Sequence, residues 1–216
     1  MKENYEYKLS AKEDLVDKWG LAIAVTIIAW LITSAFTGNA GRETFNVFWK
    51  SDGIFSIGSR TNSFGSLFSL ISFLVTGPIN LGLAVFFIHI TRKETAEIND
   101  MFSGFQIFLA AFLTNFFIVL FTVLWSLLFL IPGIIASISY SMTYYILQDQ
   151  PELSPLEAIA QSKALMRGHK MDFFILAISF VGWFLLSLIT FGLGFLYLLP
   201  YYNATKAHFY NDLISN

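Results

Sequence analysis

Histidine is the residue to test first for catalysis or metal binding, because the 216-residue chain contains no cysteine. The absence of Cys excludes disulfides, thiolate nucleophiles and Cys-ligated metal sites. His89, His169 and His208 each lie at the predicted cytoplasmic end of a span, without the H-E-x-x-H or paired spacing of metal sites. The chain also lacks a G-x-S-x-G sequence, a Walker loop and paired carboxylates within an apolar segment. We therefore predict separate interfacial histidines, no enzymatic activity and no cofactor, with a shared three-histidine site as the alternative.

Basic residues gather at Lys163, Arg167, His169 and Lys170, which we call the basic cluster. Such side chains attract anionic lipid headgroups, and each contributes about 1 kcal/mol near an anionic surface. In the alternative, an ordinary positive-inside anchor, the same charges only orient the neighbouring span. The basic cluster is thus a candidate contact for lipid headgroups.

Four polar residues interrupt the apolar segments: Asn80, Asn115, Ser141 and Thr143. They could line an intramembrane polar pocket, or they could form hydrogen bonds between helices, which contribute about 0.6 kcal/mol each. No Asp, Glu, Lys or Arg lies in the interior of the predicted spans, whereas buried charges mark proton relays and many ion pathways. This pattern argues against a proton-coupled pump and leaves open a pathway for a neutral solute.

Composition indicates that these residues are held by a membrane protein. The chain is 56% hydrophobic and 13% charged, against about 25% charged residues in a soluble domain. Its apolar residues fall in several long runs, and uninterrupted runs of about 18 residues or more indicate membrane spans. The net charge of −2 gives no nucleic-acid footprint. We predict an all-α, multi-pass helical bundle whose partner is the lipid bilayer, with an oligomeric state that the sequence does not determine.

The apolar runs predict about six spans arranged as hairpins, within one membrane domain over residues 20–216. These spans lie near residues 20–36, 64–90, 105–131, 134–148, 173–191 and 193–208. The 48 charge-free residues 101–148 would form a helix of roughly 72 Å, whereas the hydrocarbon core is about 30 Å thick. We therefore predict a tight external turn at Pro132 and Gly133, with a proline kink in one long helix as the alternative.

Other glycines and prolines give weaker signals. Pro78 predicts a kink in a single crossing over residues 64–90, or else a re-entrant first half. Gly192 and Gly194 interrupt the last apolar run, and Pro200 follows them. Residues 173–208 therefore cross either twice, as a second hairpin, or once.

Two polar segments predict amphipathic helices at the membrane interface. In residues 1–19, Ser10 and Glu13 match a capping box, and Leu15 and Trp19 lie four apart on one face; a frayed tail is the alternative. The acidic character of this segment argues against a cleaved signal peptide. In residues 148–172, Ser154, Pro155 and Glu157 start a helix, and Gly168 ends it.

The distribution of Lys and Arg predicts how the chain is threaded. With a cytoplasmic N-terminus, six crossings place ten of the 13 basic residues inside, whereas four crossings place seven there. Six crossings are therefore favoured, and both termini are predicted to be cytoplasmic, in a bacterial cytoplasmic membrane. On the outside, this model leaves Arg42, Lys50 and Arg60.

The two predicted hairpins also resemble each other. In residues 101–112 and 165–180 a glycine precedes a Phe-rich run, and each hairpin ends in Tyr-x-x-Thr, at an offset of 60–64 residues. A duplicated unit explains this pattern, and chance similarity between Phe- and Leu-rich helices is the alternative.

Several motifs carry a resemblance to a known family. They are Ile131–Gly133, Tyr140–Met142, Leu156–Lys170 and Phe180–Trp183. With these motifs the chain resembles domain-of-unknown-function family 975, and the similarity covers most of the sequence, least in residues 37–63. The resemblance implies a multi-pass membrane protein typical of Gram-positive bacteria and transfers no activity or site residue.

Two functions fit these observations. Uncharged spans and amphipathic helices favour an accessory or scaffold protein that interacts with anionic lipids or other membrane proteins. The alternative is a transporter or channel for a small or amphipathic solute, because the helix breaks expected at Pro78, Pro132 and Pro200 often surround binding sites.

Overall fold

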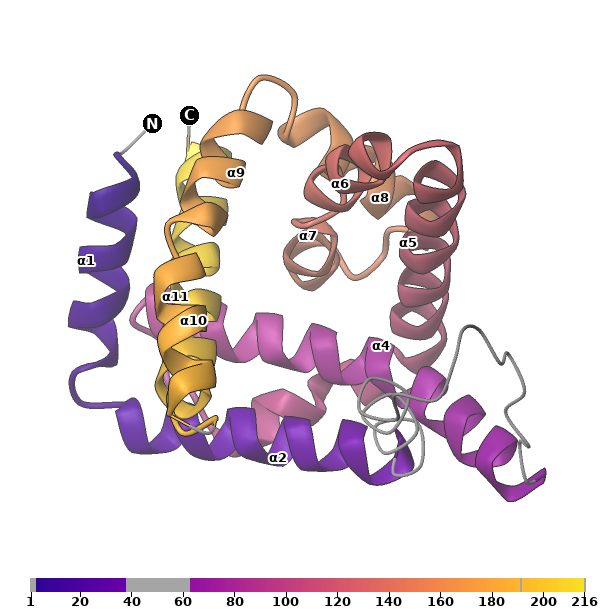
Figure 1. Ribbon diagram of the computed structural model, residues 1–216, viewed down its shortest axis with the longest axis horizontal. Helices are drawn as coiled ribbons and strands as arrows, with labels where there is room; N and C mark the ends of the chain where they lie inside the picture. Colours follow the sequence, from indigo (N-terminus) through magenta and orange to yellow (C-terminus); the bar gives the residue numbers. More distant parts are fainter. Residues whose placement is uncertain (1–2, 38–62, 191, 216) are drawn as a thin grey trace, which may run out of the picture.

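The computed structural model describes residues 3–37, 63–190 and 192–215, and every regular element in this part is a helix (Figure 1). The elements are α1 (Asn4–Leu15), α2 (Trp19–Thr37), α4 (Ser63–Thr91), the 3₁₀ helix η1 (Ile98–Phe105), α5 (Phe108–Leu128), α6 (Leu130–Ser139), α7 (Thr143–Asp149), α8 (Pro155–Leu165), α9 (Lys170–Ile178), α10 (Val181–Ile189) and α11 (Phe195–Ser215). The predicted all-α class is therefore confirmed. The predicted external charges Arg42, Lys50 and Arg60 lie outside the described residues.

Helix α4 forms the centre of the fold. It contacts η1, α2, α5, α7 and α11, and its side chains Phe86, Phe87 and Ile88 are fully buried. By contrast, the apolar surfaces of α5 and of α9–α10 are mostly exposed, with 17% and 22% of their most apolar windows buried. Exposed apolar surface on this scale is typical of helices that face lipid or a partner.

Four stretches are long and apolar enough to cross a membrane: Leu70–Thr91, Phe108–Leu128, Leu130–Asp149 and Lys170–Ile189. They coincide with the predicted spans near 64–90, 105–131, 134–148 and 173–191, and are compatible with a membrane protein. The predicted span 20–36 falls on α2, which counts as a fifth candidate only together with α1, at a bend of 99°. The predicted span 193–208 falls on α11, which does not qualify because its second half is polar. Six spans are thus not confirmed.

The chain reverses between α5 and α6 at Phe129, three residues before the predicted turn. Phe129 is extended, with φ −161° and ψ 152°, and α6 begins at Leu130. Pro132 lies in the first turn of α6, where the missing N–H has no intrahelical partner to lose. Gly133 packs against α5, since an added Cβ would lie 2.9 Å from the Cα of Ser126. Phe129 therefore makes the turn. Pro132 lies in the first turn of the second helix of the pair, and Gly133 allows this helix to pack closely against α5.

The other predicted breaks have different outcomes. Pro78 and Pro200 lie inside the continuous helices α4 and α11. Gly192 has φ +89° in the turn before α11, a conformation that favours glycine. Gly194 packs on Ser187 as Gly133 packs on Ser126, and the two contacts are 61 residues apart. This recurring Ser–Gly contact agrees with the offset of the predicted repeat.

The N-terminal helix differs from its prediction in start and in surroundings. It begins at Asn4 with a capping box between Glu3 and Glu6, whereas Ser10 lies inside the helix. Its apolar face, Tyr7, Ala11 and Leu15, is buried in the protein core, and α1 packs alongside α11 (Figure 1). Trp19 belongs to the next helix, beyond the bend, and stacks on Tyr197 at 4.3 Å. The face predicted for the membrane surface therefore packs against protein.

Candidate functional site

The basic cluster lies where α8 passes into α9. Ser154 and Glu157 form the predicted capping box, with hydrogen bonds of 2.9 and 3.3 Å. The side chain and the backbone N–H of Ser154 both interact with the Glu157 carboxylate and lower its pKa. Gly168, with φ +93°, lies in the turn, and Lys170 starts both α9 and a candidate span. The predicted start and stop signals of α8 are thus confirmed, and they place the basic cluster at one end of a candidate span.

The basic side chains of the cluster are available to a ligand. Lys163 and Arg167 are exposed, and Lys170 is half-buried. Within the described ranges, these three side chains form no ion pair or hydrogen bond, whereas His169 Nδ1 lies 3.5 Å from Asp172 Oδ2. Three positive charges within eight residues therefore remain without an internal counterion.

Several basic residues elsewhere have internal partners. The guanidinium of Arg92 donates two hydrogen bonds to Asp149, at 2.8 and 2.7 Å. Lys18 donates to the carbonyl of Glu94 at 3.2 Å. Lys8 donates to the carbonyl of Ser179 at 3.1 Å, where α9 gives way to α10. These three basic side chains thus stabilise the fold through internal contacts, whereas the Lys and Arg side chains of the basic cluster have no such contacts among the described residues.

The three histidines lie beside different carboxylates. His89 Nδ1 lies 3.0 Å from Asp100, and His208 Nε2 lies 2.9 Å from Asp14, while His169 faces Asp172. The pair of His208 and Asp14 joins α11 to α1. The three histidines thus have different partners, as predicted for separate histidines, and their location at the membrane interface stays a prediction.

The structure unites two of the four predicted intramembrane polar residues and leaves the other two apart. The hydroxyl of Tyr144 donates to Asn115 Oδ1 at 2.9 Å, and the polar side chain of Asn80 lies beside the same hydroxyl. Thr143 instead donates to the carbonyl of Tyr140 at 2.8 Å, and the buried hydroxyl of Ser141 has no hydrogen-bond partner among the described residues. Tyr144 thus connects α7 to α5 in the interior.

The candidate span Leu130–Asp149 is interrupted between α6 and α7. A serine of α8 forms hydrogen bonds with two backbone groups at this interruption. The buried hydroxyl of Ser162 donates to the carbonyl of Ser139 at 2.8 Å and accepts from the N–H of Met142 at 3.2 Å. Sequence reasoning missed Ser162, because one serine beside Ile159 and Ala158 gives no signal of a distant partner. The two backbone groups of the break are therefore already used within the protein.

Replacing Ser162 with alanine should destabilise the protein by about 1–2 kcal/mol, because two buried backbone groups lose their partner. Thermal unfolding of the purified protein in detergent, followed by Trp fluorescence, measures the effect. Ser137→Ala is the matched control, since Ser137 is exposed and bonds within its own helix. Equal unfolding temperatures for the two variants would contradict the role assigned to Ser162.

A polar joint, formed by Arg92, Asp149, Tyr210 and Asn211, fastens α4, α7 and α11. Asp149 accepts from Arg92 and, at 2.8 Å, from the hydroxyl of Tyr210. Asn211 Oδ1 accepts from Arg92 Nε at 3.2 Å, and the Asn211 amide donates to Thr91 at 2.9 Å. The joint is a fully engaged network that offers no free charge.

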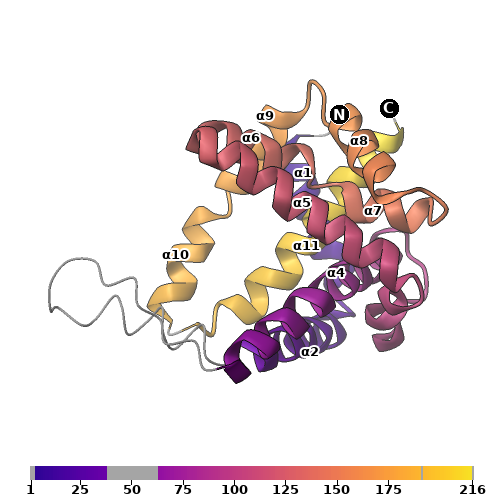
Figure 2. The ribbon, with the colours of Figure 1, turned by 90° about the vertical axis from the view of Figure 1, so that its right-hand side faces the viewer.

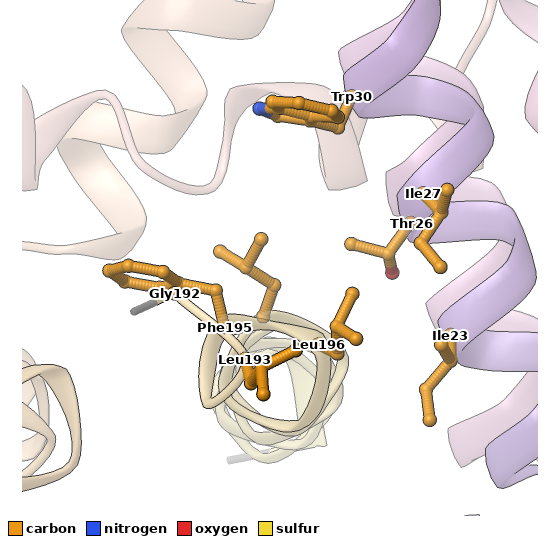
Figure 3. Close-up of a pocket in the computed structure, with 9 residues that line it drawn as sticks. Ile23, Thr26, Ile27, Trp30, Gly192, Leu193, Phe195 and Leu196 are labelled. Atoms are coloured by element: carbon orange, nitrogen blue, oxygen red, sulfur yellow. The ribbon is translucent and has the colours of Figure 1, made fainter. Parts of the chain in front are cut away.

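A cavity of about 580 Å³ lies between α2 and the start of α11 (Figure 3). Figure 3 shows Ile23, Ile27 and Trp30 on α2 facing Leu193 and Leu196 across it. The polar atom of Thr26 is occupied, because its hydroxyl donates to the carbonyl of Ala22 at 2.7 Å. This cavity can take an apolar chain, and the described residues that line it include no charged side chain to fix a ligand.

Comparison with known proteins identifies a family. No curated protein and no solved structure matches the chain. A family model described as "Protein of unknown function (DUF975)" matches residues 1–139 and 127–216, so that the two matches together cover the whole sequence. The chain therefore belongs to the DUF975 family, as the motifs of the sequence predicted.

Proposed function

We propose that this protein is a multi-pass protein of the bacterial cytoplasmic membrane that binds anionic lipid headgroups through its basic cluster. In this role it serves as an accessory or scaffold protein and catalyses no reaction. One observation carries the proposal: Lys163, Arg167 and Lys170 have no internal counterion in the described part of the chain and stand at the end of a candidate span. Basic side chains in that position attract anionic headgroups.

The arrangement of the helix ends supports the threading that places this cluster on the cytoplasmic side. Figure 2 shows the turn between α5 and α6 and the end of α10 on one side of the fold. Helix α8 and the C-terminus lie on the other side. This grouping matches the charge distribution, with uncharged turns outside and the basic cluster inside.

The rival function, transport of a small solute, receives some support from the break between α6 and α7 inside a candidate span. Broken helices bind solutes through backbone groups that they leave free. Here, however, Ser162 occupies two of these groups, and Asn115 accepts a hydrogen bond from Tyr144. Solute flux in proteoliposomes that disappeared in an Asn115→Val variant would favour transport over the proposed function.

Neutralising two exposed charges of the cluster, K163Q/R167Q, should weaken the preference for phosphatidylglycerol over phosphatidylcholine by about 10- to 30-fold, since each charge contributes about 1 kcal/mol. Native mass spectrometry of the protein released from mixed nanodiscs measures the retained lipids. High salt should reduce the preference of the wild-type protein, because exposed charges are screened.

The control K12Q/K93Q removes two exposed lysines, one in α1 and one just after α4, that are far in sequence from each other and from the cluster. It changes the net charge equally and should retain most of the preference. If both double variants bound phosphatidylglycerol as the wild-type protein does, the basic cluster would be only an anchor and the proposal would fail.

A further inference from the structure

Three polar side chains of α11 lie close to α7, and one of them, Tyr210, donates to Asp149. Tyr202, Lys206 and Tyr210 follow one another at four-residue spacing and share one face of α11. The ring of Tyr210 stacks on Tyr145 of α7 at 5.2 Å, and the ammonium of Lys206 lies 5.4 Å from the centre of the Tyr145 ring. This face therefore brings an ammonium group close to the rings of α7.

The carboxylate of Asp149, which joins α7 to α11 through Tyr210, is already engaged. Asp149, at the end of α7, accepts two hydrogen bonds from Arg92 and one from Tyr210. In the part of the chain that the structure describes, no carboxylate pairs with Lys206. The lysine has only the face of the Tyr145 ring to stabilise its charge.

Two hydroxyl groups near Lys206, those of Tyr145 and Tyr202, also lack an internal acceptor among the described residues. The side chains of Tyr145 and Tyr202 interact electrostatically, and neither hydroxyl forms a hydrogen bond within the described residues. Tyr145 is buried, with 3% of its surface exposed, while Tyr202 and Lys206 are half-buried. The polar atoms of these three residues are not among the fully buried atoms that lack a partner in the described part of the chain, so each keeps some exposure and can be reached by a ligand.

The chemistry of Tyr145, Tyr202 and Lys206 indicates which kind of ligand would fit them. One donor is a cation and two are neutral hydroxyls, so that the matching ligand is an anion with several acceptor oxygens. We propose that Tyr145, Tyr202 and Lys206 form a binding site for a phosphate group. This site is separate from the basic cluster on α8 and α9 and does not depend on the proposed function.

Two sources of phosphate fit the position of the site. Residue 206 falls in the second, polar half of α11, which leads toward the side of the fold that holds α8 and the C-terminus (Figure 2). A lipid headgroup could enter there from the membrane surface, and a soluble phosphoester could enter from the aqueous phase. Both present the same tetrahedral anion to the three donors.

Native mass spectrometry and thermal unfolding of the whole protein test the proposal, with three probes: inorganic phosphate, glycerol phosphate and phosphatidylglycerol in nanodiscs. We expect at least one probe to bind and to raise the unfolding temperature. Lys206→Met should weaken that binding by about 10-fold or more, and Tyr202→Phe by several-fold, because each removes a donor to an anion. The responding probe distinguishes the lipid source from the soluble one.

Lys206→Arg and Lys12→Gln are the controls. The arginine variant keeps the positive charge and should retain binding, which separates loss of the site from loss of the fold. Lys12 is exposed on α1, so its replacement should leave binding unchanged. Absence of binding by all three probes, or equal binding by wild type and Lys206→Met, would overturn the proposal and leave water as the partner of these donors.

Discussion

Replacing Gly82 with alanine is expected to cost about 3 kcal/mol of stability, the upper end of the usual range for overpacking. The backbone of η1 lies directly against α4 at this position. An added Cβ would collide with the carbonyl group of Met101 and would lie 2.8 Å from the Met101 Cα. These are backbone atoms, which cannot rotate away as the end of a flexible side chain can. The variant must therefore push η1 off α4 or unfold both.

Thermal unfolding in detergent measures this effect, and the chain supplies its own comparison. Gly104→Ala should be similarly damaging, since its Cβ would lie 2.9 Å from the Cα of Pro78 across the same contact. Gly182 lies in α10 with no atom within 4 Å of an added Cβ, so that Gly182→Ala should be neutral or slightly stabilising. If Gly82→Ala and Gly182→Ala unfolded at the same temperature, the close approach of η1 to α4 would be wrong.

The helix η1 and its contact with α4 could not be predicted from the sequence. The predicted spans near residues 64–90 and 105–131 have no predicted helix between them. The structure instead forms a 3₁₀ helix over Ile98–Phe105, with a capping box between Glu97 and Asp100, and α5 starts at Phe108. Met101 is fully buried. The fit of Gly82 to Met101 joins residues 19 positions apart, and such a contact leaves no local pattern.

Local signals, by contrast, were predictable. The cap of α8 depends on residues three positions apart, and the apolar lengths of four spans depend only on composition. The turn at Phe129 was missed because proline is tolerated in the first turn of a helix, so that Pro132 marks the start of α6 rather than the reversal. The N-terminal apolar face was assigned to lipid because sequence periodicity does not say what a face packs against.

For the candidate site too, the residues could be predicted from the sequence, whereas their contacts depend on the fold. The residues of the basic cluster were visible as a local concentration of charge, but their lack of internal partners depends on the whole fold. Asn80 and Asn115 were visible as polar residues in apolar runs, yet their meeting required a third helix and Tyr144. Lys206 was counted only as a cytoplasmic charge, because the acceptors around it cannot be inferred from its neighbours in sequence.

The second large loss of stability is expected at the polar joint. Arg92→Ala should destabilise the protein by about 2–3 kcal/mol, because Asp149 would lose both hydrogen bonds from its charged partner and remain largely desolvated. The two side chains are 30% and 23% exposed, so that water relieves part of the loss and keeps it below the cost in a fully dry core. Denaturant unfolding in detergent provides the free energy.

A double-mutant cycle with Asp149→Asn separates the pair from other effects of the truncation. If the charge pair carries the stability, Arg92→Ala should cost much less in the Asp149→Asn background, where no carboxylate remains to be stranded. Tyr210→Phe, which removes one neutral donor to Asp149 and keeps the ring on Tyr145, should cost only about 1 kcal/mol. Additive losses in the cycle would instead mean that Arg92 acts through Asn211 and packing, and that α4, α7 and α11 are held together without the ion pair.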